Sequence, residues 1–344
     1  MSELTFKPKA VSKKLLSQLN PRTRDIVIHR YGLEKADKMT LEAIGKKYDI
    51  TRERVRQIEN FALASIKKTK DFRDHAFVFD ELKSIVKDLG SVVGEEALMR
   101  SISKDPVVQN HIALYLALGE DFTKHKEDIH FVHHWSVDKS LTQKIQNALQ
   151  TLYASITPEE LVKEEELYAR FLTHVGDLVS EYKDNKEVIN RYLALSKVIG
   201  KNQLSEWGHT ASPHIRARGI KDYAFLVLRS AGKPLHFKEV ANQINKTFKK
   251  KAHVATCHNE LIKDSRFVLV GRGMYGLKEW GHAGGVVKDV IRKVLEEAGA
   301  PLTKEDIISG VLARRMVKQN TIVVNLQNDK IFKKYKDGTY SLAK

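Results

Sequence analysis

Cysteine is nearly absent from this sequence, since Cys257 is the single one among 344 residues. One cysteine excludes the internal disulfide framework that stabilises many small secreted proteins. No apolar run approaches the roughly 18 residues of a membrane span, and the opening stretch MSELTFKPKA lacks the apolar centre of a signal peptide. We therefore expect a cytoplasmic protein without a membrane segment.

Sets of metal ligands and phosphate-binding loops are also missing. His253, Cys257 and His258 lie close together, and His133 adjoins His134, but neither set has the spacing of a zinc site. The glycines of the stretch GRG open a hairpin rather than a helix, so they do not form a phosphate-binding loop. We find no catalytic constellation, and we expect no enzyme activity, no cofactor, no metal and no small-molecule substrate.

Acidic residues are scarce at both ends of the chain. The formal net charge is +16, with +9 in residues 1–70, −7 in residues 71–210 and +14 in residues 211–344. Polyanion binding depends on clustered Lys and Arg that displace counterions, so both ends are expected to face DNA. The acidic middle is better suited to a spacer or to a protein contact.

Two short helices are predicted in the stretch TLEAIGKKYDITRERVRQIENFA, residues 40–62. Thr40 and Thr51 are each suited to cap a helix. Each helix carries an apolar stripe at three- and four-residue steps, formed by Leu41, Ile44 and Tyr48 and by Val55, Ile58 and Ala62. Packing the two stripes together across a short turn gives a helix-turn-helix, whose second helix turns its opposite face outward.

That outward face is rich in side chains that read bases. Arg52 and Arg56 are four residues apart, as are Glu53 and Gln57, so all four project from the first turn and a half. A recognition helix enters the major groove by this end, where Arg, Gln and Glu hydrogen-bond to base edges. A solvated, salt-bridged surface helix is the alternative interpretation.

The stretches LNPRTRDIVIHRYGL and MTLEAIGKKYDITRERVRQIENFALASIKK resemble region 4 of the primary bacterial sigma factors, over about residues 15–68. The resemblance implies binding to the promoter −35 element and to the flap of RNA polymerase. It implies base contacts by Arg52, Glu53, Arg56 and Gln57, and phosphate contacts by Arg22, Arg30, Thr40, Thr51 and Arg54. No segment resembles sigma region 2, which melts the −10 element.

A repeat occupies the C-terminal part of the chain, where residues 220–280 align with residues 287–344. Each copy predicts three helices closed by a β-hairpin, which together make a winged helix. The first helices are expected to end at Gly232 and Gly299, because glycine readily takes the left-handed turn. The third helices are expected around residues 253–263 and 320–328.

Two weaker copies are expected in the acidic middle, at about residues 76–138 and 141–209. The first would begin with FDELKSIVKDLG, and the second would contain the long helices SLTQKIQNALQTLYASI and EEELYARFLTHVGDLVSEY. A plain helical bundle is the alternative for this region. Trp135, Trp207 and Trp280 recur at the end of each wing, so we expect them to be core residues that lock the hairpin in place.

Residues 220–280 resemble the HARE-HTH family, winged-helix modules of chromatin and restriction proteins with a relative in the RNA polymerase delta subunit. GKPLHFKEVANQI and RFVLVGRGMYGL carry this resemblance, which implies a link to DNA or to the polymerase. Candidate DNA contacts are Lys250, Thr256, His258, Asn259, Lys263 and Arg272 in this copy, and Lys318, Gln319, Thr321 and Asn325 in the last. A solvated or protein-binding face is the alternative.

The prediction is a mainly α protein, with an N-terminal helix-turn-helix followed by a tandem array of winged-helix units. The expected domains are residues 1–70, 71–139, 140–210, 211–282 and 283–344. The expected function is that of a sequence-specific, nucleoid-associated transcription factor that binds double-stranded DNA and RNA polymerase. The alternatives are a delta-like accessory protein that binds the flap or any duplex, and a DNA-specificity subunit of a defence nuclease.

Overall fold

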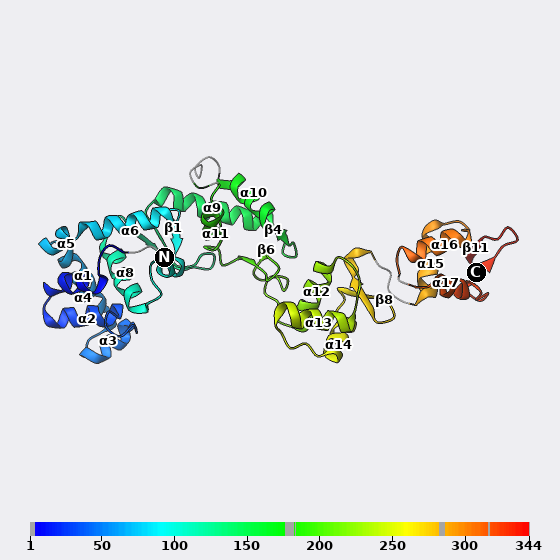
Figure 1. The fold of residues 1–344 in the computed structure, drawn as a ribbon, viewed down its shortest axis with the longest axis horizontal. Helices are drawn as coiled ribbons and strands as arrows, with labels where there is room; N and C mark the ends of the chain where they lie inside the picture. The colour runs from blue at the N-terminus through cyan, green and yellow to red at the C-terminus, as the bar shows by residue number, and fades with distance from the viewer. Residues whose placement is uncertain (1–3, 176–181, 183, 282–285, 316, 344) are drawn as a thin grey trace. The chain divides into compact units, whose positions relative to one another are not determined.

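The computed structural model describes residues 4–175, 182, 184–281, 286–315 and 317–343. The chain divides into two compact units, one of residues 1–200 with 207–210 and one of residues 201–206 with 211–344. Most described residues are helical, and the strands form sheets of two or three strands (Figure 1). The prediction of a mainly α fold is confirmed. Among the described residues, no helix combines the length and the apolar character needed to cross a membrane.

The first unit begins with the helices α1 (Pro8–Ser17), α2 (Pro21–Tyr31), α3 (Leu41–Tyr48) and α4 (Arg52–Lys67). The predicted caps start α3 and α4. The Thr40 hydroxyl accepts a hydrogen bond from the Ala43 N–H at 3.1 Å, and the Thr51 hydroxyl accepts one from the Arg54 N–H at 3.2 Å. Each bond satisfies a backbone donor that has no partner within its helix.

A small core holds these helices in a helix-turn-helix. Ile26 of α2, Ile44 of α3 and Val55 of α4 are fully buried against one another. Gly45 is needed where α3 meets the turn, because a Cβ there would lie 2.6 Å from the Ile50 carbonyl oxygen. The turn between α3 and α4 therefore depends on a residue without a side chain at this position. The predicted helix-turn-helix is confirmed.

The chain continues with α5 (Lys70–Asp74), α6 (Ala76–Asp88), β1 (Val92–Gly94), α7 (Glu95–Ile102), α8 (Pro106–Leu118), β2 (Thr123–His125) and β3 (His134–Ser136). β3 lies between β1 and β2 and is antiparallel to both. Trp135 in β3 faces Val93 on one side and Lys124 on the other. Its side chain is buried, as the sequence predicted.

One large core joins the helix-turn-helix to this segment. The helices α1, α2 and α4 pack against α6 and α8 through buried apolar side chains, among them Leu15, Leu16, Leu19, Val27, Ala62, Ile66, Val78, Leu82, Ile112 and Leu116. Apolar burial stabilises by about 25 cal/mol per Å² removed from water. The back of the helix-turn-helix is therefore covered by its own chain.

Buried polar contacts fix how α8 sits against the helix-turn-helix. Asn110 Nδ2 donates a hydrogen bond to the carbonyl of Gly32, the residue that ends α2, at 2.9 Å. The Ser12 hydroxyl of α1 lies 2.7 Å from the Tyr115 hydroxyl and 2.8 Å from His111 Nδ1. Because hydrogen bonds are directional, these contacts specify one register for the packed helices.

The chain continues with α9 (Lys139–Ser155), β4 (Val162–Lys163), α10 (Glu164–Val175), α11 (Lys186–Leu193), β5 (Ile199–Lys201) and β6 (Glu206–His209). The strands lie in the order β4, β6, β5. This part has a core of its own, which includes Ile145, Phe171 and the buried Trp207. The helix predicted to run to residue 182 is observed as far as Val175, and residues 176–181 lie outside the described part.

The second unit begins with α12 (Ile220–Ala231), β7 (Leu235–His236), α13 (Phe237–Phe248), α14 (Val254–Lys263), β8 (Phe267–Gly271) and β9 (Met274–Leu277). β9 lies between β7 and β8. Gly232 ends α12 with a φ of 63°, as the sequence predicted. Trp280 is half-buried rather than fully in the core, because it follows β9 in a short 3₁₀ helix instead of lying in the strand.

The chain ends with α15 (Val287–Ala298), α16 (Lys304–Leu312), α17 (Gln319–Leu326), β10 (Phe332–Lys334) and β11 (Tyr340–Leu342). The two strands pair antiparallel. Leu302 forms a single bridge to Tyr340. Gly299 ends α15 with a φ of 65°, as expected for its repeat partner Gly232.

One order of elements recurs along the chain: helix, strand, two helices, and two strands. It starts at α6, α9, α12 and α15, and in the last case Leu302 stands in the place of the first strand. The three helices and the closing hairpin are the elements predicted for a winged helix, whereas the strand after the first helix was not predicted. The number of winged-helix units stays a prediction. The five-domain division stays a prediction, and a single core already spans the proposed boundary at residue 70.

Candidate nucleic-acid interface

The N-terminal end of α4 displays the predicted base-reading side chains together. Arg52, Glu53, Arg56 and Gln57 are all exposed, while Val55 between them is completely buried. The helical period produces this division, since Val55 faces the core formed with α2 and α3 and its neighbours point away. The four residues therefore share one accessible surface.

These side chains are paired along the helix. Glu53 accepts two hydrogen bonds from Arg56, at 2.9 Å from Nε and 2.6 Å from Nη2. Arg54 Nη1 donates to Gln57 Oε1 at 3.2 Å. The hydrogen bond from Arg56 is the largest cause that lowers the pKa of Glu53. The carboxylate thus stays ionised beside three arginines.

Two of the predicted phosphate-binding residues have a structural role as well. Thr40 and Thr51 cap α3 and α4 through their hydroxyls, and both are exposed. A capping hydroxyl keeps its own hydrogen available to donate. The structure therefore leaves each threonine able to cap its helix and to meet a phosphate.

Arg30 is engaged inside the protein. Its Nε donates to Glu59 at 3.1 Å, and the two side chains are 34% and 13% exposed. The same carboxylate lies near Tyr31, whose pKa is raised mainly by burial and also by Glu59. Arg30 thus links α2 to α4, and its predicted phosphate contact stays a prediction.

A groove of about 460 Å³ lies beside the base-reading surface. Arg22, Arg54 and Gln57 line it together with Ile58 and Phe61. The structure thus brings two predicted phosphate-binding arginines and one predicted base reader to the same groove. Sequence reasoning missed Phe61, which is 67% exposed. Its position four residues after Gln57 was the available signal, because that spacing places both on one helix face.

In the second unit, α14 and its hairpin present most of the predicted contacts. Thr256, Asn259 and Lys263 on α14, Lys250 ahead of α14 and Arg272 at the hairpin are exposed. His258 differs from the prediction of an outward side chain. It is half-buried, because its ring stacks on Phe237 at a centroid distance of 4.2 Å.

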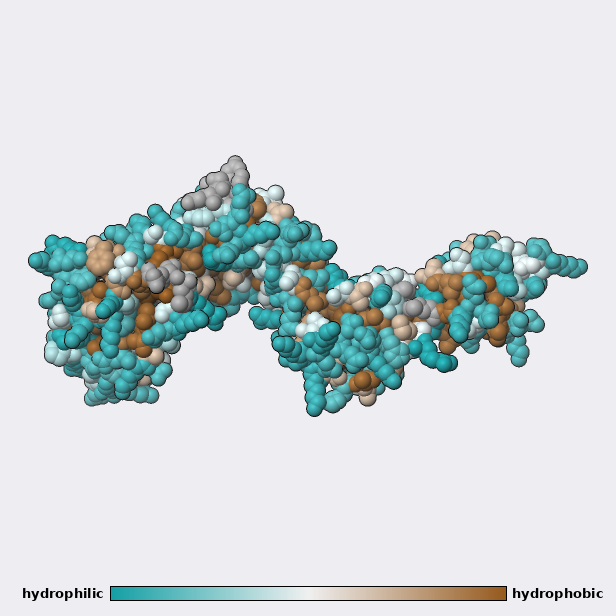
Figure 2. Space-filling view, in the orientation of Figure 1, coloured by the Kyte–Doolittle hydropathy of each residue, from teal (hydrophilic) through white to brown (hydrophobic). Residues whose placement is uncertain are grey.

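The last copy shows the same pattern. Lys318, Gln319 and Thr321 are exposed near the start of α17. Asn325 is half-buried, and its Nδ2 donates to the Thr321 carbonyl at 2.7 Å, so this amide serves the helix itself. On the face drawn in Figure 2, hydrophilic side chains cover much of the described chain, with smaller hydrophobic patches between them.

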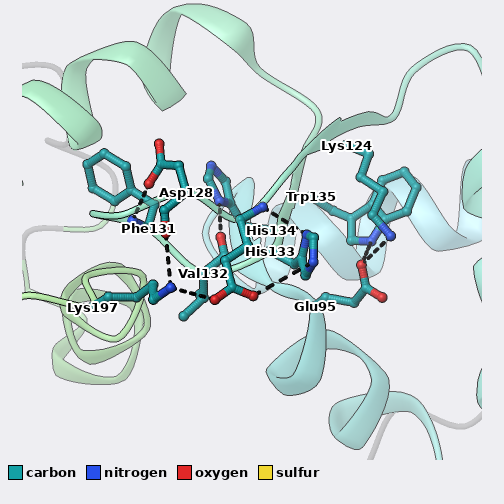
Figure 3. A network of polar contacts seen from close by, with 10 residues as sticks. Glu95, Lys124, Asp128, Phe131, Val132, His133, His134, Trp135 and Lys197 are labelled. Carbon is teal, nitrogen blue, oxygen red and sulfur yellow. Dashed lines mark hydrogen bonds and ion pairs between the residues drawn. The ribbon is translucent and has the colours of Figure 1, made fainter.

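In residues 76–137, the counterparts of α14 and its hairpin are α8 and the hairpin of β2 and β3, and both contact other parts of the same chain. α8 is buried against the helix-turn-helix through residues such as Ile112 and Leu116. The hairpin of β2 and β3 is tied to the segment that follows α11 (Figure 3). Lys197 Nζ donates to Glu127 at 2.5 Å and to the Asp128 carbonyl at 2.9 Å. α8 is therefore not available to enter a DNA groove, and the segment between β2 and β3 is held by Lys197.

The other end of the same hairpin is fixed to α7. Glu95 lies 2.7 Å from Lys124 Nζ and accepts a hydrogen bond from Trp135 Nε1 at 3.2 Å (Figure 3). The ammonium and indole N–H donors both favour the ionised carboxylate, and the pKa of Glu95 is lowered even though burial acts against this. The network holds the hairpin against its own helices.

The cysteine and histidine cluster of α14 is not arranged as a metal site. Cys257 is buried, and burial raises the pKa of its thiol to about 11. Within the described ranges, no group of three His, Cys, Asp or Glu side chains could hold a metal ion.

Two segments match known families. Residues 15–68 match the family model described as "Sigma-70, region 4". Residues 218–280 match the HARE-HTH model, whose description includes the words "restriction endonuclease HTH domain".

Similar proteins match the first segment. RNA polymerase principal sigma factor HrdD of Streptomyces coelicolor is 46% identical over 54 residues, 16% of this chain and 16% of that protein. RNA polymerase sigma factor SigA of a Nostoc species is 47% identical over 55 residues, 16% of this chain and 14% of that protein. RNA polymerase sigma factor RpoS of Coxiella burnetii is 49% identical over 55 residues, 16% of each.

These matches span 14–16% of the length of the three relatives, so the likeness concerns one module of each. In this chain that module is the helix-turn-helix whose back is covered by α6 and α8. The chain therefore combines a sigma-70 region 4 segment, residues 15–68, with a HARE-HTH segment, residues 218–280, in one polypeptide.

Proposed function

We propose that this protein is a transcription factor that recognises a −35-like promoter element through α4. One observation carries the proposal. Arg52, Glu53, Arg56 and Gln57 are exposed together at the start of a helix whose opposite side is anchored by the fully buried Val55. Side chains of these types, held on a rigid helix end, are suited to hydrogen-bond to base edges in a major groove.

Phosphate contacts would orient that helix on the duplex. Arg22 and Arg54 line the groove beside the base-reading surface, and Thr40 and Thr51 are exposed at the ends of α3 and α4. Contacts of this kind fix the register of a protein on DNA and carry no sequence information themselves. The proposed action is binding without chemistry.

The second unit would bind the DNA that flanks the recognised element. Lys250, Lys263 and Arg272 are exposed around α14, and residues 211–344 carry a net charge of +14. Exposed lysines and arginines release counterions when they meet phosphates, so this contribution falls steeply with salt.

RNA polymerase is the proposed protein partner. The support is the likeness of residues 15–68 to proteins named as RNA polymerase sigma factors. Co-purification of polymerase subunits with a tagged full chain tests this part separately from DNA recognition.

A second candidate function is that of an accessory protein that binds any duplex, or the polymerase itself, with little base specificity. The strong positive charge of residues 211–344 favours it. A third candidate is a DNA-specificity subunit of a defence nuclease. It is favoured by the match of residues 218–280 to a family that is described in part as a restriction endonuclease HTH domain. That subunit would need a catalytic partner chain, and the co-purification experiment would recover it.

Two substitutions separate sequence reading from general binding. Arg56→Ala is expected to cost about 1–3 kcal/mol on the preferred duplex and little on scrambled duplexes, because a bidentate base contact is lost. Lys250→Ala should weaken both duplexes alike, because Lys250 would meet phosphate. Fluorescence anisotropy with labelled duplexes at several salt concentrations gives both numbers. Equal losses on both duplexes for Arg56→Ala would favour the accessory-protein function.

In cells, the decisive measurement is genome-wide footprinting of the tagged protein alongside polymerase occupancy. The proposed function predicts binding sites that coincide with promoters. Binding sites unrelated to promoters would contradict the proposed function.

A further inference from the structure

A cavity of about 900 Å³ lies in the first unit, where the helix-turn-helix meets the segments that follow it. Its walls come from the loop between α2 and α3, from α7 and α8, from the segment between β2 and β3, and from α11. Figure 3 labels three of the wall residues, Glu95, Val132 and His133. Ligand-binding cavities commonly measure about 300–1,000 Å³, so this one can hold a molecule of nucleotide size.

Two acidic side chains in the wall are already neutralised from outside the cavity. Glu95 lies 2.7 Å from Lys124 Nζ, and Glu127 lies 2.5 Å from Lys197 Nζ, while neither lysine belongs to the wall. The hydrogen bond from Lys197 is the largest cause that lowers the pKa of Glu127. Both carboxylates therefore stay ionised and paired, and they do not leave the cavity with a net negative charge.

Lys38, in the loop between α2 and α3, supplies a positive charge to the same wall. Its ammonium group makes no ion pair or hydrogen bond with the residues that the structure describes. The pKa of Lys38 is lowered mainly by burial and further by the charges of Lys124 and Arg30, whereas Glu95 raises it. A bound anion would oppose this shift, because an opposite charge favours the ammonium form.

Two arginines add further donors. Arg100 pairs with Glu96, and both side chains are largely exposed. Arg191 Nη2 lies 3.0 Å from Glu187, which is 82% exposed. Ion pairs between solvent-exposed side chains are weak, so a ligand anion can compete for either guanidinium. Arginine is also well suited to bind phosphate or carboxylate oxygens through two hydrogen bonds at once.

The rest of the wall is suited to an organic molecule. Ala97, Met99, Val132 and Ala194 bring apolar groups to the cavity. His133 Nδ1 accepts a hydrogen bond from the backbone N–H of residue 127 at 2.9 Å, so the neutral ring carries its hydrogen on Nε2. The cavity therefore combines an apolar surface with N–H donors and one cation that lacks a counterion within the described chain.

We propose that this cavity binds an organic phosphate of about nucleotide size, with its phosphate beside Lys38 and its organic part against Met99 and Val132. A phosphate carries about −1.5 to −2 charges and three acceptor oxygens, so it can meet Lys38 and an arginine together. The wall residues are distinct from the base-reading surface and from the groove beside it. The ligand is bound without a reaction, and its binding does not require the proposed recognition of DNA.

Isothermal titration calorimetry on the full chain tests the site. Phenyl phosphate, benzoate and phenol share one aromatic ring and differ in the attached group, so they separate a phosphate from a carboxylate and from an uncharged ligand. Adenosine monophosphate and adenosine make the same comparison with a larger organic part. A salt concentration of about 0.15 M screens attraction to the exposed charges elsewhere on the protein.

Substitutions in one loop locate the phosphate. Lys38→Met removes the charge and keeps the length of the side chain, Lys38→Arg keeps the charge, and Lys35→Met removes an exposed lysine of the same loop that lies outside the wall. We expect Lys38→Met to weaken binding of both phosphates about tenfold, which corresponds to about 1.4 kcal/mol. Lys38→Arg should restore most of the affinity, and Lys35→Met should change nothing.

A substitution of Ala97 tests where the organic part lies. Ala97 is an exposed wall residue of α7, so Ala97→Trp should fill part of the cavity and weaken adenosine monophosphate more than phenyl phosphate. Thermal unfolding of each variant supplies the control for folding. Lys38 is exposed, so its substitution should leave the unfolding temperature unchanged.

Three results would overturn the proposal. The first is the absence of binding by either phosphate at millimolar concentration. The second is binding that Lys38→Met leaves at wild-type strength, which would assign the phosphate to a basic surface elsewhere on the protein. The third is tighter binding of benzoate than of phenyl phosphate, which would make the ligand a carboxylate.

Discussion

At the scale of single residues, the observed capping role of Thr51 and its proposed phosphate contact should respond differently to substitution. Its hydroxyl caps α4, and it is also a predicted phosphate contact. Thr51→Asp should keep the cap, because aspartate is among the best capping residues and suits the positive helix end. The same change should weaken duplex binding roughly tenfold or more, because it places a negative charge against phosphate. Urea denaturation and anisotropy measure the two effects.

Matched substitutions make this test decisive. Thr51→Ser should leave stability and binding close to wild type, and Thr51→Ala should cost about 1 kcal/mol of stability. Binding of Thr51→Asp at wild-type strength would restrict Thr51 to its capping role.

At the scale of elements, the packing of α8 on α1 brings a buried histidine into the contact. His111 is 3% exposed, and its Nδ1 contacts the Ser12 hydroxyl. The pKa of His111 is lowered from its ordinary 6.5, mainly by burial and also by the charge of Lys9, whereas the charge of Asp105 raises it.

The sign of the pH effect follows from that shift. The unfolded chain takes up a proton at His111 as the pH falls through 6.5, whereas the folded protein takes it up only at lower pH. The free energy of unfolding should thus be independent of His111 above this range and decline below it. His111→Gln should reduce the decline measured by urea denaturation between about pH 7 and pH 5.5. His253→Gln, which removes an exposed histidine, should leave the decline unchanged.

The core that the helix-turn-helix shares with α6 and α8 leads to a second prediction at this scale. A fragment of residues 1–70 would expose Leu15, Leu16, Val27 and Ile66, which α6 and α8 cover in the full chain. Burying one such side chain is worth about 1.5–3 kcal/mol, so the fragment should be unstable or should self-associate. A fragment of residues 1–138 should unfold cooperatively. Circular dichroism and light scattering would show the difference, and a stable, monomeric 1–70 fragment would contradict it.

At the scale of the whole molecule, the two compact units divide the charge unequally. Residues 1–210 carry a net charge of +2, and residues 211–344 carry +14. We expect a fragment of residues 1–210 to retain the base preference of the full chain with weak overall affinity. A fragment of residues 211–344 should bind all duplexes alike, with a steep salt dependence. Anisotropy titrations on preferred and scrambled duplexes distinguish the two. A sequence preference in the second fragment would show that α14 or α17 also reads bases.

Local sequence signals predicted a good part of the fold. The Thr40 and Thr51 caps, the apolar stripes of α3 and α4, and the left-handed glycines Gly232 and Gly299 all act within a few residues of chain. Such short-range physics can be read from the order of residues. For the same reason, the exposed set at the start of α4 could be chosen in advance.

The sequence by itself determined which helix faces are apolar, where the helices begin and which polar side chains share the surface of α4. Tertiary structure alone decided that α8 is buried against the helix-turn-helix, that the β2 and β3 hairpin is tied to Lys197, and that Phe61 borders a groove beside Arg54. These outcomes depend on which surfaces meet among residues far apart in the chain. Periodicity shows that a surface must be covered, but only the packed fold decides what covers it.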